Sequence, residues 1–73
     1  MSDLDNAVEQ AKGAEEVLEN LLEEFGEWLE EADGESERET LENVINHLEA
    51  MNREYAKRRR EAERQLAAQQ TAS

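Results

Sequence analysis

Apolar residues recur every seven positions along most of this chain, and that repeat limits the fold to helices packed side by side. In the first half they fill three neighbouring columns of the heptad: Leu4, Ala11, Leu18, Phe25 and Ala32; Ala7, Ala14, Leu21 and Trp28; and Val8, Leu22 and Leu29, with Glu15 interrupting the third. The second half repeats these columns with Leu41, Leu48, Tyr55 and Ala62; Val44 and Met51; and Ile45 and Leu66. Glutamates back the first stripe, so both halves are predicted to form amphipathic helices of an all-α fold.

The ends of the two helices carry sequence signals. Gly34 follows the first stripe and is predicted to end the first helix in the left-handed conformation, which glycine adopts without a Cβ penalty. Ser36 and Glu39 then fit a capping box, in which the serine accepts from the N3 amide and the glutamate reaches back to the Ser36 amide. Ser2 with Asp5 is a weaker version of this box at the start of the chain.

These signals predict one domain with two helices. The expected bounds are 1–68 for the hairpin, about 3–33 and 37–68 for its helices, and 69–73 for a frayed tail. Gly13 and Gly26 each lower the stability of the first helix by ~1 kcal/mol relative to alanine. We expect a continuous first helix; a break near Gly26, which would give three helices, is the alternative.

Two helices of similar length joined by a short loop predict an antiparallel hairpin. The apolar stripe is wider than one helix–helix seam requires, and a chain of 73 residues buries few side chains by itself. We therefore expect two hairpins to pair as a homodimeric four-helix bundle. The predicted dimer interface comprises Leu18, Leu22, Phe25, Trp28, Leu29, Leu41, Ile45 and Leu48.

Charge is concentrated in the first helix. The chain has a net charge of −12, and residues 1–35 hold 13 acids with Lys12 as their one base. Because like charges four residues apart destabilise a helix, solubility alone is a poor explanation for a face of one sign. The pattern predicts that this face docks on a basic protein surface, as an inhibitor, adaptor, co-chaperone or nucleic-acid decoy; a merely solvated face is the alternative. The candidate partner-binding residues are Glu9, Glu16, Glu19, Glu23, Glu27 and Glu30.

One basic cluster, Lys57, Arg58, Arg59 and Arg60, offers a competing function, because such clusters bind nucleic-acid phosphates. The net charge and the interleaved glutamates favour charge pairing with the first helix, so direct nucleic-acid binding is the weaker hypothesis. A further alternative is a structural element that acts through its own coiled-coil-like oligomerisation. Phage-encoded inhibitors are often this short and acidic, which is an analogy of class and not of family.

Catalytic and metal-binding patterns are missing from the sequence. The serines and threonines lie at predicted caps or in the tail, and there is no glycine-rich phosphate loop, so we predict a protein that is not an enzyme. His47 has no metal-binding residue three or four positions away, and the chain has no cysteine, so no metal or cofactor is expected. The longest apolar run, 66–68, is too short to cross a membrane, and the acidic start is unlike a leader, which favours a cytoplasmic location.

Overall fold

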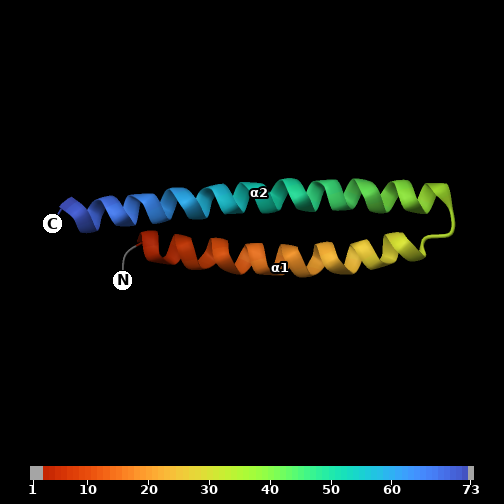
Figure 1. The fold of residues 1–73 in the computed structure, drawn as a ribbon, viewed down its shortest axis with the longest axis horizontal. Coiled ribbons are helices and arrows are strands. Elements are labelled where there is room, and N and C mark those ends of the chain that lie inside the picture. The colour runs from red at the N-terminus through yellow and green to blue at the C-terminus, as the bar shows by residue number, and fades with distance from the viewer. Residues whose placement is uncertain (1–2, 73) are drawn as a thin grey trace.

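The structure is a computed structural model that describes residues 3–72. It contains two helices, α1 (Asp3–Glu31) and α2 (Glu35–Ala72), joined by a three-residue turn over 32–34. The helices run antiparallel, side by side, and α2 extends beyond the start of α1 (Figure 1). The hairpin measures 59 × 15 × 14 Å. The predicted all-α hairpin is therefore confirmed for a single chain.

Both helices differ from their predicted bounds near the turn. The first helix ends at Glu31 instead of 33, and the second begins at Glu35 instead of 37 and continues past 68 to Ala72. The first helix is continuous through Gly26, as expected. The predicted cap at Ser2 lies outside the described residues, as does the last residue of the predicted tail.

The turn corrects two details of the capping prediction. Within residues 3–72 no glycine has a positive φ, so the left-handed conformation predicted for Gly34 is wrong. Instead, the Gly34 carbonyl accepts a hydrogen bond from the Arg38 amide at 3.0 Å, which closes the first turn of α2. Ser36 therefore lies inside that turn and not at the cap, and its carbonyl accepts from the Thr40 hydroxyl at 3.0 Å. Glu35 and Glu37 suit the positive end of the helix dipole, which favours the earlier start.

The core is one narrow seam between the helices. Its buried apolar residues are Val8, Ala11, Leu18, Ala32, Leu48 and Ala62. Most belong to the first heptad column, whereas Ala7 and Trp28 of the second column are exposed, so the second column does not lie in the seam as a whole. Such a small core gives a single hairpin marginal stability, because few side chains offset the entropy of ordering the chain.

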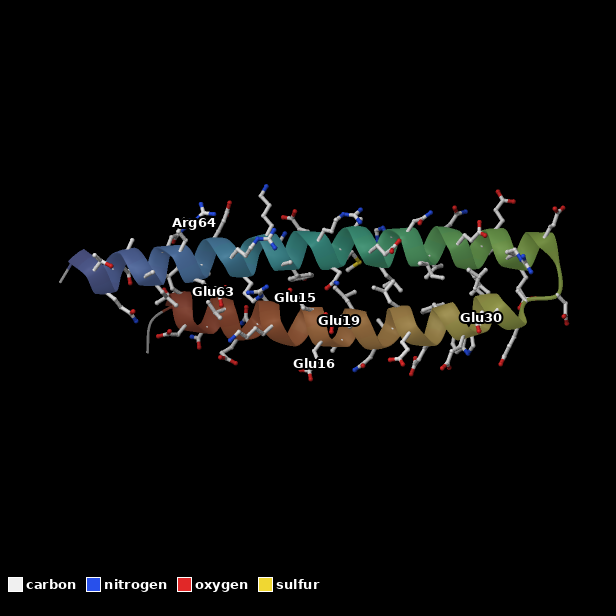
Figure 2. All side chains as sticks on the ribbon, in the orientation of Figure 1. Glu15, Glu16, Glu19, Glu30, Glu63 and Arg64 are labelled. Atoms are coloured by element: carbon white, nitrogen blue, oxygen red, sulfur yellow. The ribbon has the colours of Figure 1, made fainter. Side chains whose placement is uncertain are left out.

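Neither helix is built to cross a bilayer. Within residues 3–72 no stretch of α1 or α2 is apolar enough over the length that a membrane-spanning helix requires. Charged side chains instead project outward along α1 and along α2 as far as Arg64 (Figure 2).

Candidate protein-binding surfaces

The outward side of α1 carries a row of glutamates that we call the acidic face. It consists of Glu9, Glu16, Glu19, Glu23, Glu27 and Glu30, all of them exposed. Figure 2 shows Glu16 pointing away from α2, on the side of α1 opposite the seam. The ion pairs of the described residues involve other carboxylates, namely Glu15, Glu54 and Glu63. The negative charge of the acidic face is therefore not neutralised within the hairpin.

Glu15 behaves differently from its neighbours because it turns toward α2. Its carboxylate lies between the helices (Figure 2) and accepts from the Arg59 Nε at 2.6 Å. The Arg59 Nη1 also donates to Glu63 at 2.8 Å. We call Glu15, Arg59 and Glu63 the polar bridge. The hydrogen bond to Glu15, with the negative charges of both carboxylates, raises the pKa of Arg59 above its ordinary value.

The polar bridge explains why Glu15 interrupts an apolar column. Glu15 and Arg59 occupy the same column of their respective helices, each four residues after the first column. Both side chains are only partly exposed, 16% for Glu15 and 26% for Arg59. Asn52 precedes Arg59 by seven residues in the same column, and its side-chain carbonyl is buried without a hydrogen-bond partner among the described residues. This side of the seam is therefore polar toward the open end of the hairpin.

The other members of the basic cluster form no ion pair with α1 among the described residues. Arg58 pairs with Glu54 of its own helix at 3.3 Å and lies over the Tyr55 ring at 5.2 Å from the centroid. Lys57 and Arg60 are exposed and form no ion pair with any described residue. Of the predicted charge pairing between this cluster and the first helix, the Arg59–Glu15 ion pair is the only one present among residues 3–72.

The predicted dimer-interface residues occupy three environments in the single chain. Leu18 and Leu48 are buried within the hairpin, so they contribute to its own core. Trp28 is 51% exposed and touches Phe25 edge-on, with ring centroids 4.9 Å apart. The remaining members are half-buried: Leu22, Phe25, Leu29, Leu41 and Ile45.

Sequence reasoning missed Val17, which is 57% exposed and lies on the side of α1 that carries Trp28. Val17 falls outside the three apolar columns, just before Leu18, and a search restricted to those columns overlooks it. Its position one turn before Leu21 is the signal that could have found it.

No metal centre is assembled in the described part of the chain. No group of three histidine or acidic side chains there is arranged to hold an ion, and His47 is exposed. A shallow hollow on the first turns of α2 is lined by Glu35, Arg38, Glu39 and Glu42 and is open to solvent. The chemistry that these surfaces offer is binding by charge and by apolar contact.

Comparisons with protein-family models, curated proteins and solved structures find no match to this chain.

Proposed function

We propose that this chain is a non-enzymatic protein-binding protein that docks the acidic face of α1 on a basic surface of a partner protein. The observation that carries the proposal is the row of six exposed glutamates without ion pairs among the described residues. Like charges at four-residue spacing, such as Glu19–Glu23 and Glu23–Glu27, each destabilise an isolated helix by ~0.2–0.5 kcal/mol. A binding role gives a reason to retain this repulsion, which a mixed surface would avoid.

The partner contact is mainly electrostatic in this proposal. Complementary charge accelerates encounter and selects the partner, and the attraction weakens as salt screens it. An inhibitor or adaptor that covers a basic site would work in this way, and so would a decoy for a nucleic-acid-binding surface. Each chain has a net charge of −12, so a homodimer would present twice that negative charge to the partner.

Assembly of the chain with itself is the second candidate, and we propose a homodimer as the form that binds the partner. The exposed Trp28 and Val17 favour it, since neither is covered within the hairpin. The thin seam favours it as well, because a second hairpin would bury more apolar surface. The acidic face points away from the seam and stays accessible in such a dimer.

The test of the proposed function compares two charge-matched double variants. Glu16→Lys with Glu23→Lys reverses the centre of the acidic face, and Glu42→Lys with Glu49→Lys makes the same change in net charge on exposed positions of α2. Each protein is immobilised and exposed to nuclease-treated lysate of the native cells, and captured proteins are quantified by mass spectrometry. Circular dichroism verifies that both variants remain helical.

We expect a basic protein to be captured by the wild type and by the α2 variant, to elute with added salt, and to be lost from the α1 variant. Equal capture by the α1 variant would show that the acidic face is only a solvated surface. Capture of no protein above the bare matrix would also contradict the proposal.

A further inference from the structure

One side of the hairpin leaves apolar side chains in solvent. Val17 and Trp28 are 57% and 51% exposed. About three helical turns separate them, so they project from the same side of α1. Leu21 lies between them on that side and is half-buried. The edge-on contact with Phe25 fixes the Trp28 ring without covering it.

Two residues of α2 extend this surface. The Glu15–Arg59 hydrogen bond shows that positions four residues after the first column share one face of the hairpin. Positions three residues after that column therefore share the opposite face. In α2 these positions hold Val44 and Met51, both half-buried, and then Arg58. We define the apolar flank by its five members: Val17, Leu21, Trp28, Val44 and Met51.

Charged side chains lie at both ends of the apolar flank. The exposed Glu31 lies one turn after Trp28 and borders the end of the flank toward the turn, whereas the exposed Glu24 lies along the edge of the flank between Leu21 and Trp28. The turn at 32–34 brings Met51 to about the level of Val17, and Arg58 lies about two turns further toward the open end. The Arg58 side chain is 61% exposed there and pairs with Glu54 of its own helix at 3.3 Å. The flank therefore has the Glu31 carboxylate at one end and the Arg58–Glu54 ion pair at the other.

We propose that the apolar flank binds the same flank of a second copy of this chain, with the two hairpins antiparallel. This inference rests on the homodimer proposed above, and it specifies which face of the hairpin forms the dimer interface and how the two chains are oriented. A two-fold axis near Leu21 brings Arg58 of each chain level with Glu31 of the other, diagonally across the interface, and Trp28 of each close to the level of Met51 of the other. A parallel pair would instead bring Glu31 level with Glu31 and Arg58 level with Arg58 across the interface, and like charges close to each other there are unfavourable.

The dimensions of the flank suit such a pair. A face 59 Å long and 15 Å wide can accommodate the ~800 Å² that each partner buries in a standard interface. Trp28 would lie within the buried part, where a tryptophan anchor contributes most. The acidic face lies on the outward side of α1, so this dimer leaves it free for the partner protein.

The face is tested with Val17→Asp and a matched control, Asn20→Asp, which adds the same charge at an exposed position on the outward side of α1. Sedimentation equilibrium gives the dimer dissociation constant, and circular dichroism reports helix content. We expect at least a tenfold rise in that constant for Val17→Asp, with Asn20→Asp close to the wild type. A dimer that survives Val17→Asp uses another face and overturns the inference.

The direction is tested with spin labels on Gly34→Cys, because the chain has no cysteine of its own and no atom lies within 4 Å of a Cβ built at Gly34. Double electron–electron resonance should give about 40 Å between the labels of an antiparallel pair, against under about 20 Å for a parallel one. Arg58→Glu should weaken the dimer several-fold, and adding Glu31→Arg to the same chain should restore it.

The outcomes separate the inference from the proposed function. A short label distance, or no rescue by the charge swap, overturns the antiparallel arrangement and leaves the homodimer standing. A chain that stays monomeric at all concentrations overturns both the homodimer and this inference, whereas partner capture by the acidic face is measured independently. A foreign protein bound at the apolar flank in place of a second copy would also refute the inference.

Discussion

The substitution Gly26→Ala measures how much a glycine in the middle of α1 lowers the stability of that helix. The helix is continuous through Gly26, its φ is not positive, and a Cβ built there meets no atom within 4 Å. Alanine should therefore fit without strain and remove a helix-propensity penalty of ~1 kcal/mol. Because 1 kcal/mol moves the Tm of a domain of 60–100 residues by roughly 4–8 °C, the effect is large enough to measure.

Gly13→Ala is the matched control for this prediction. Gly13 also lies within α1 with no atom within 4 Å of its built Cβ, and it faces solvent. The two sites are roughly 20 Å apart along the helix, so their effects should add. Thermal and urea unfolding followed by circular dichroism measure both, at a fixed protein concentration because dimerisation makes Tm concentration-dependent.

The contrast between the two glycines also tests the proposed dimer. Gly26 lies one turn after Leu22, on the side of the hairpin that carries the polar bridge. If Gly26→Ala lowers Tm while Gly13→Ala raises it, something outside the single hairpin approaches the Gly26 backbone. That result would refute the open environment assigned to Gly26 and would place the second chain on the wrong side for the apolar flank.

Three further predictions concern the polar side of the seam and the basic cluster. Asn52→Leu should raise the free energy of unfolding by about 1–2 kcal/mol in urea titrations, because it removes a buried carbonyl without a partner; an unchanged or lower value would show that the amide is satisfied. Arg59→Gln should lower Tm, and more so at low ionic strength, whereas Arg60→Gln, which breaks no ion pair of the described residues, should not. Because the pKa of Arg59 is raised in the folded state, the stabilisation by its ion pairs is present at neutral pH and is lost only at strongly alkaline pH. Equal changes in Tm for Arg59→Gln and Arg60→Gln at neutral pH would contradict a stabilising role of these ion pairs. Duplex DNA should not bind appreciably near physiological salt in fluorescence anisotropy, and tight binding that weakens steeply with added salt would reverse our assignment of Lys57 to Arg60.

The heptad pattern was sufficient to predict the hairpin, because burying an apolar stripe at helical spacing leaves few other arrangements. The exposure of individual side chains in the hairpin depends on contacts between the two helices, and the sequence of one helix does not determine those contacts. Trp28 belongs to an apolar column and was placed in the dimer interface, and within the single hairpin its side chain is 51% exposed. Val17 lies outside the three apolar columns and was missed because only those columns were searched.

In the candidate sites too, features set by position along one helix could be predicted, whereas features set by contacts between the helices could not. The exposure of Glu16 and Glu23 follows from their position opposite the stripe, and it could be predicted. The choice of Arg59 over its neighbours as the partner of Glu15 depends on the register between α1 and α2, which residue spacing along one helix does not fix. The start of α2 was misplaced because the turn needs only three residues, and this let the helix begin before Ser36.

Site-specific photocrosslinking in the native cells tests most directly that one chain presents two separate binding surfaces. A photoreactive side chain at Asn20 lies among the glutamates of the acidic face without replacing any of them, and the same side chain at Val17 lies on the apolar flank. We predict that position 20 crosslinks to a basic protein of a different mass, and that position 17 gives a product of twice the 8.4 kDa chain. Crosslinking of position 17 to a foreign protein, or the absence of any partner at position 20, would contradict the account.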